Sequence, residues 1–267
     1  NNPQRSASML DLTFYDFCTR EPNLNLMLNT TVSEVNLSGN SIRSVKAYRQ
    51  STEDEFEIIA KVFCDCTGDG RLGFEANAKF FKGRESKLEF DESLAQNKAD
   101  NKTLGSTILL QARKHDDPIP FTPPTWARKF SEDELRLRPH GGIGVDRGFE
   151  YGYWWVEWGG QPDTIKDNEI IRDELLSILL GIWDHIKNSG NHKADNWALD
   201  WFGFLPGKRE SRRFCGLHVL SQKEIQGSLH FDDAIAFGGW PIDTHPPEGI
   251  DAPDIKPANQ VELNHIY

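Results

Sequence analysis

The sequence predicts an α/β protein, and three observations lead to this fold class. Residues 6–18 have helical periodicity, and short strands that end in a glycine-rich turn follow them. A long amphipathic helix is predicted from Ile165 to Asn188. Between these parts lies an aromatic run, Tyr151 to Trp158, that is typical of a strand. Helices and strands are therefore both expected in quantity.

The bulk composition suits a globular protein that acts on a small molecule. The chain has 267 residues, 37% hydrophobic residues and a formal net charge of -11. Such an acidic chain lacks the basic footprint that nucleic-acid binding requires. No apolar run approaches the roughly 20 residues that cross a bilayer. We therefore expect a small-molecule substrate, no nucleic acid and no membrane span.

The first 70 residues predict a helix, a small meander and a buried strand. Extended segments are expected over 24–35, 42–47, 56–59 and 61–66. The last of them carries Cys64 and Cys66 on one face, which favours buried, reduced thiols. The four cysteines form no CxxC pair, and the eight histidines show no HExxH or His-x-His spacing. No metal site is predicted.

The middle of the chain mixes irregular and regular segments. A short helix is expected over 74–78, a strand over 107–112, and irregular chain over the proline-rich residues 116–126. In the aromatic strand 151–158, alternation places its side chains on two opposite faces. These faces hold Trp154, Val156 and Trp158 on one side and Tyr153, Trp155 and Glu157 on the other.

The helix over 165–188 is predicted from one apolar stripe, and we interpret it as structural, with His185 at its surface or boundary. Thr164 and Asp167 fit a capping box at its start, and Ser189-Gly190 fits its end. Beyond it, an aromatic segment, a short helix from Ser221 and a Gly/Trp/Pro loop over 238–247 are expected.

Three segments carry residues that are suited to chemistry. Thr67, Gly68, Asp69 and Gly70 end an apolar strand, where glycines let backbone amides approach a ligand. A tight turn without a ligand explains the same residues.

The second segment is a basic cluster around Arg209, Arg212 and Arg213, with Glu210 among them. Guanidinium groups bind carboxylate or phosphate in a bidentate manner, so the cluster suggests recognition of an anion. Surface ion pairing in an acidic protein is the alternative.

The third segment is the loop that contains Trp240, Asp243 and His245. Asp243 and His245 share one side of an extended chain and are suited to act as an acid/base pair. Trp240 is suited to stack on a sugar or a flavin. A rigid loop without chemistry is the alternative reading.

Longer blocks place these segments in a family. The order of "NLNLMLNTTVSEV", "SIRSVKAY" and "AKVFCDCTGDG" resembles the middle of a glutathione-reductase-type FAD-binding domain. The blocks "TGDGRLGFEANAKFFKGRESKLEFDESLA", "WWVEWGG", "DTIKDNEIIRDELLSILLGIWDHIKN", "LDWFGFLPGKRESRRFCG" and "AFGGWPIDTHPPEGI" resemble bacterial FAD-dependent oxidoreductases, some of which are labelled xanthan lyases. The resemblance covers nearly all of residues 1–260.

The resemblance implies a partial FAD/NAD(P)-binding, Rossmann-like domain with an inserted α+β substrate domain. Residues 1–73 would be the partial FAD domain, 74–230 the inserted domain, and 231–267 the segment that returns to the FAD domain. FAD would be held by Val32 and by the turn residues Thr67, Gly68, Asp69 and Gly70.

The resemblance also implies hydride transfer from an unidentified small molecule, possibly related to carbohydrates, to the flavin. His245, Asp243 and Glu210 would be the acid/base residues. Substrate binding would fall to Arg209, Arg212, Arg213 and Trp240.

Two other functions fit the residues less completely. A polysaccharide-processing lyase or hydrolase without a cofactor would use the tryptophans and carboxylates, and a non-catalytic binding domain would use neither. The family's GxGxxG segment, which cradles the pyrophosphate, is not in this sequence. We therefore expect an internal fragment that binds FAD weakly and is inactive by itself.

Overall fold

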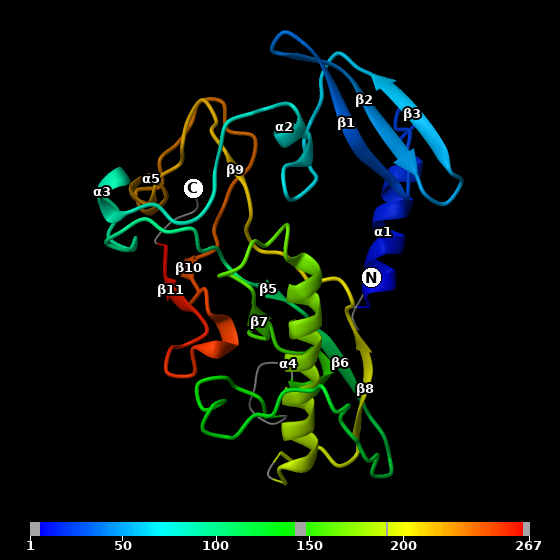
Figure 1. The fold of residues 1–267 in the computed structure, drawn as a ribbon, viewed down its shortest axis with the longest axis vertical. Coiled ribbons are helices and arrows are strands. Elements are labelled where there is room, and N and C mark those ends of the chain that lie inside the picture. The colour runs from blue at the N-terminus through cyan, green and yellow to red at the C-terminus, as the bar shows by residue number, and fades with distance from the viewer. Residues whose placement is uncertain (1–5, 142–147, 191, 264–267) are drawn as a thin grey trace. The chain divides into compact units, whose positions relative to one another are not determined.

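The computed structural model describes residues 6–141, 148–190 and 192–263. The chain divides into two compact units, Asn1–Phe80 and Phe81–Tyr267. The division lies close to the predicted boundary after residue 73. Residues 231–263, expected to return to the first domain, cluster with the second unit. Each unit is described by itself below (Figure 1).

The first unit holds a helix and a three-stranded antiparallel sheet. Helix α1 (Ala7–Arg20) precedes β1 (Thr30–Ser38), β2 (Ser41–Arg49) and β3 (Asp54–Ile59), which lie in the order β1-β2-β3. The predicted helix and the two predicted hairpin strands after it are confirmed. The turn between β1 and β2 is tight, and Gly39 has the positive φ of 61° that this turn requires.

The predicted fourth strand over 61–66 is wrong. These residues form no strand, and Val62 is 83% exposed. No partner strand among the described residues lies beside this segment. The chain that follows it is held by a side chain instead, because the carboxylate of Asp65 accepts from the amide groups of Thr67 and Gly73. Cys64 and Cys66 are free thiols as expected, but they are exposed rather than buried. The next helix, α2 (Arg71–Glu75), begins three residues before the predicted 74–78.

The second unit is built from short elements around one long helix. Its strands form two-stranded sheets. The pairs β5 with β7, β6 with β8, and β10 with β11 are antiparallel, and β4 pairs with β9. Its elements, from β4 at the boundary onward, are β4 (Phe80–Phe81), α3 (Lys87–Phe90), β5 (Ser106–Thr107), β6 (Leu110–Lys114), η1 (Gly148–Glu150), β7 (Glu157–Trp158), α4 (Asn168–Asn188), β8 (Trp197–Phe202), β9 (Arg213–Phe214), α5 (Gln222–Gln226), β10 (Ile242–Thr244), η2 (Gly249–Asp251) and β11 (Asn259–Val261).

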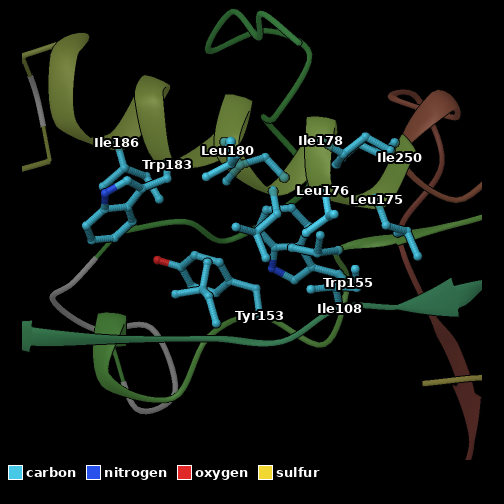
Figure 2. Close-up of a cluster of buried hydrophobic side chains, with 14 of the residues drawn as sticks. Ile108, Tyr153, Trp155, Leu175, Leu176, Ile178, Leu180, Trp183, Ile186 and Ile250 are labelled. Carbon is cyan, nitrogen blue, oxygen red and sulfur yellow. The ribbon is translucent and has the colours of Figure 1, made fainter. Parts of the chain in front are cut away.

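Helix α4 carries the core of the second unit, as its apolar stripe predicts. Its inner face is fully buried, and Figure 2 shows its side chains pointing toward Ile108, Tyr153 and Trp155. The buried residues of the helix include Ile171, Leu175, Ile178, Leu179, Ile182, Trp183 and Ile186. The helix ends at the predicted Ser189, and Gly190 has a φ of 89°. The core therefore fixes the chain segments on either side of this helix.

The predicted capping box at the start of α4 is wrong. The N-cap is Asp167, and no side chain caps the first turn. Asp167 instead accepts from the backbone N–H of Asp163, and Thr164 donates to the carbonyl of Glu210. Both side chains thus form hydrogen bonds outside the helix and do not cap its first amide groups.

The aromatic run before β7 is a buried loop and not a long strand. Only Glu157 and Trp158 pair as a strand. Tyr153 and Trp155 stack with ring centroids 5.1 Å apart, and Val156 is buried beside them, so the expected alternation fails after residue 155. Burial on all sides explains this, because a segment inside a core needs no period of two.

The predicted strand 107–112 is likewise split into β5 and β6. The break lies at residues 108–109, where Ile108 enters the core and the carbonyl of Leu109 accepts from Gly203. Helix α5 agrees with its prediction, and Ser221 and Glu224 form a full capping box. The described chain is a mixed α/β structure with small sheets, and none of its helices has the length and apolar character to cross a membrane.

Candidate active site

The second unit brings an imidazole and two carboxylates together in its interior. His245 directly follows β10, and Glu157 is the first residue of β7. Their side chains are 4% and 3% exposed, respectively. The site is thus assembled from segments 88 residues apart, in a region from which water is largely excluded.

The ring of His245 lies between two acids. Its Nδ1 atom is 2.7 Å from Glu157 Oε2, and its Nε2 atom is 3.3 Å from Asp243 Oδ2. Because an ionised carboxylate only accepts hydrogen bonds, Nδ1 donates to Glu157, and the second acid near Nε2 favours the protonated ring, an imidazolium. The predicted Asp243–His245 pair is therefore present. Glu157, which is distant in the sequence, is its third member.

Arg209 extends the site on the far side of Glu157. Its Nε atom is 3.2 Å from Glu157 Oε2, and it donates to Thr107 Oγ1 and to the carbonyl of Trp154. Two positive groups thus face two carboxylates. The charges balance, which is what allows a carboxylate to remain ionised where it is buried.

The pKa of His245 is raised above its ordinary value by this environment. Burial by itself lowers the pKa of the ring, but the hydrogen bond and charge of Glu157, together with Asp243, outweigh it. The positive charge of Arg209 opposes the rise. The two acids therefore favour the protonated ring, and the ring can act as a base once Nε2 has released its proton.

The site retains hydrogen-bonding capacity. Among the described residues, Glu157 Oε1 and Asp243 Oδ1 are buried and accept no hydrogen bond. The indole of Trp154 lies edge-on to His245, with centroids 5.5 Å apart, and is half exposed to solvent.

Glu210 lies in a different network from His245. Its carboxylate accepts from the backbone N–H of Leu104 and pairs with Arg213. Arg213 also binds Glu85 and the carbonyl of Gly83. These contacts join three chain segments of the second unit, so both side chains have a structural role.

The remaining predicted binding residues differ in exposure. Arg212 is partly buried, and Trp240, which precedes β10, is 71% exposed.

In the first unit, the predicted cofactor turn is held open by its neighbours. Gly68 and Gly70 have φ values of 79° and 67°, and no atom lies within 4 Å of the position that a Cβ of Gly68 would occupy. Thr67 Oγ1 donates to Asp65 and accepts from the amide of Arg71. Burial alone would raise the pKa of Asp65, yet the hydrogen bonds from Thr67 and Gly73 lower it. Asp65 is thus an ionised anchor for the turn.

The structure connects this turn to Val32. The β1–β2 register is shifted between Val32 and Glu34, which leaves Ser33 at a bulge. The guanidinium of Arg71, the first residue after the turn, donates to the carbonyl of Ser33 at 3.2 Å. The five predicted cofactor residues thus belong to two segments that a single arginine joins.

Comparison with known proteins agrees with the sequence blocks. A family model described as FAD dependent oxidoreductase matches residues 3–266. The chain belongs to this family. A search of the curated proteins gives no match, and a search of the solved structures gives none. The family is FAD-dependent, so the protein is a flavoprotein oxidoreductase and FAD is its cofactor.

The residues present fit a flavin nucleotide. The N–H groups of Gly68 and Gly70 donate no hydrogen bond to the described residues, and the space over Gly68 is open. Donors of this kind match the oxygen acceptors of a phosphate or sugar.

Glu157 is the residue of the site that the sequence did not assign. The sequence places it in the apolar run "WWVEWGG", where packing was the favoured interpretation. A lone acid in such a run is itself a signal, because a buried carboxylate requires a partner. The identity of that partner follows only from the fold.

Proposed function

We propose that the protein oxidises a small molecule by hydride transfer to FAD, with His245 as the acid/base residue. The observation that supports this is the buried imidazole held between Glu157 and Asp243. A group of this kind moves a proton at a fixed atom, Nε2, while the substrate loses its hydride.

In this proposal, FAD is held by Val32 and by the turn Thr67 to Gly70, within a partial Rossmann-like domain of residues 1–73. When bound, FAD would supply the acceptor for the hydride, which carries two electrons. Residues 74–230 form the inserted substrate domain, and 231–267 return toward the FAD domain. Arg71 supports the site by holding the turn against β1.

The other residues of the second unit orient the acid/base group. Glu157 accepts from Nδ1 and fixes the orientation of the ring, and Asp243 faces Nε2. Once Nε2 has released its proton, the neutral nitrogen takes the proton of the substrate hydroxyl while the hydride of the same carbon passes to FAD. Arg209 forms an ion pair with Glu157 and adds positive charge toward an anionic substrate.

Arg212 and Trp240 would contact the substrate from outside the buried centre. An exposed indole stacks well on the face of a sugar, so carbohydrate-related alcohols are the first substrate class to test. Glu210 would act only through Arg213. The lyase or hydrolase alternative is not favoured, because the family match names a flavin-dependent chemistry.

The first experiment is the visible absorption spectrum of the full-length protein, purified and reconstituted with FAD. We expect an oxidised-flavin band that is bleached anaerobically by a sugar alcohol or aldose from a panel. Gly68→Val should weaken flavin retention, because a β-branched residue fits poorly at a φ of 79° and fills the open space.

The matched control is Gly39→Val, which introduces the same strain in the β1–β2 turn, at a φ of 61°. We expect this variant to retain flavin at wild-type stoichiometry. Equal loss in both variants would mean that the unit unfolds and that the turn has no specific role. A flavin-loaded protein that no member of the panel reduces would reject the carbohydrate class alone.

A further inference from the structure

Three histidines and a glutamate converge in the second unit, away from the proposed active site. They are His140, His185 and His192 with Glu132, and their ligand atoms all lie within 4.8 Å of one another. His185 lies near the end of α4, and the other three come from the segments before and after this helix. The expectation that His185 lies at the surface or boundary is corrected here, because the residue is buried.

Four of the six distances between the ligand atoms are close to those of a tetrahedral metal site, and all six are within 4.8 Å. Glu132 Oε2 is 3.0 Å from His185 Nε2, 3.4 Å from His140 Nε2 and 3.5 Å from His192 Nε2. The Nε2 atoms of His185 and His192 are 3.2 Å apart. Ligand bonds of about 2.0–2.1 Å to a tetrahedral zinc ion would separate the ligand atoms by roughly 3.3 Å.

The outer nitrogens of two rings are already fixed. His140 Nδ1 is 2.6 Å from the carbonyl of Arg138, and His185 Nδ1 is 3.0 Å from the carbonyl of Phe130. A carbonyl only accepts, so each Nδ1 carries a proton, and the neutral ring then has its lone pair on Nε2. Histidines that bind a metal through one ring nitrogen usually donate from the other nitrogen to a carbonyl or carboxylate in this way.

Without a cation, the inner atoms are poorly matched. Two Nε2 lone pairs at 3.2 Å and a carboxylate oxygen repel each other unless protons lie between them. The three imidazole side chains are nearly buried, whereas Glu132 is 66% exposed. The cluster therefore has a solvent-facing entrance on its acidic side, through which an ion can enter.

We infer that Glu132, His140, His185 and His192 bind one divalent transition-metal ion, with zinc as the expected occupant. Three imidazoles and one carboxylate make a closed set of four ligands, which is typical of a structural site. The ion would join the segment 130–140, the end of α4 and the segment after it. The flavin and the acid/base group take no part in this inference.

The test is the metal content of the full-length protein, measured by plasma mass spectrometry after the affinity tag is removed and the protein is dialysed against zinc. We expect one zinc ion per chain and a melting temperature that rises with added zinc. Substitution with Co²⁺ should give the intense visible bands of a tetrahedral ion.

The variants are Glu132→Ala and His192→Ala, with His218→Ala as the control. His218 pairs with Glu224 near α5 and is exposed, so its loss should leave zinc binding unchanged. Each ligand variant should lower zinc affinity by more than the roughly 10–100-fold that loss of an outer-shell partner costs. Circular dichroism of the zinc-free proteins will show whether they are folded.

Two results would overturn the inference: no stoichiometric zinc in the untagged protein, or unchanged affinity in both ligand variants. Loss of zinc in His192→Ala but not in Glu132→Ala would reject the carboxylate as the fourth ligand. Because metal content is read directly, a protein without flavin or activity can still give the positive result.

Discussion

His245 donates the proton on its Nδ1 atom to Glu157 across 2.7 Å, at a point where both side chains are almost completely buried. A pair in this position is sensitive to the loss of either partner. Breaking a buried ion pair by removing one member leaves the other charge without compensation. The pair is therefore as important for stability as it is for the proposed chemistry.

We expect Glu157→Gln to lower the free energy of unfolding by about 3–5 kcal/mol, because His245 and Arg209 both lose the buried negative charge that they face. Urea denaturation followed by circular dichroism measures this change. The control is Glu34→Gln, since Glu34 and Lys46 form an exposed pair, of which the loss should cost at most about 1 kcal/mol. Similar losses in the two variants would show that Glu157 is not the buried partner described here.

The raised pKa of His245 makes the protein less stable as the pH rises. The folded protein binds the proton more tightly than an unfolded histidine with a pKa of 6.5. Its stabilising contribution is thus complete below pH 6.5 and is lost as the pH passes through the raised value. Melting temperatures from pH 6 to 9 should fall more steeply for the wild type than for His245→Gln. Parallel profiles would contradict the imidazolium assignment.

The acid side of the stability profile should depend on Asp163. Lys82 forms an ion pair with this carboxylate and lowers its pKa, burial opposes the shift, and the amides of Lys166 and Ile165 add to it. A depressed pKa gives stability above the unfolded value of 3.8 that is lost as the pH falls. Asp163→Asn should therefore flatten the decline in melting temperature below pH 4. An unchanged acid limb would assign that decline to other carboxylates.

Gly181 lies in α4 where the chain at Arg128 crosses the helix. A Cβ there would be 2.1 Å from the carbonyl of Arg128, so Gly181→Ala should destabilise the protein by overpacking, at a cost of about 1–3 kcal/mol. In an open helix the same change is favourable by about 1 kcal/mol. The control Ile170→Ala removes an exposed side chain of α4 and should have little effect on the melting temperature. A more stable Gly181→Ala variant would refute this packing.

The sequence predicted elements well where a local period determines them. The stripe of α4 predicted 165–188 against the observed Asn168–Asn188, and the short helix predicted from Ser221 agrees with α5 (Gln222–Gln226). It failed for the buried aromatic loop before β7, where contacts on all sides replace alternation. It also failed at residues 61–66, since a strand depends on a partner that no local pattern identifies.

The same reasoning explains the sites. Asp243 and His245 are two residues apart, so their pairing was readable from the sequence. Glu157 is 88 residues from His245, and His192 is separated from His140 by the whole of α4, so only the fold brings these side chains together. The predicted roles of Glu210 and the basic cluster still await a test with substrate.

Gly249 connects this assembly to the order in which the chain is made. A Cβ at Gly249 would lie 2.0 Å from the carbonyl of Glu157, so the segment that carries His245 docks against β7 through a residue without a side chain. During synthesis, Glu157 emerges long before that segment does, and a core that closes early would enclose a negative charge without its imidazolium. The hydrophobic core around α4 can therefore reach its final form only after the last part of the second unit has been translated, and a ribosome that stalls before residue 249 would leave a chain that is a substrate for proteolysis.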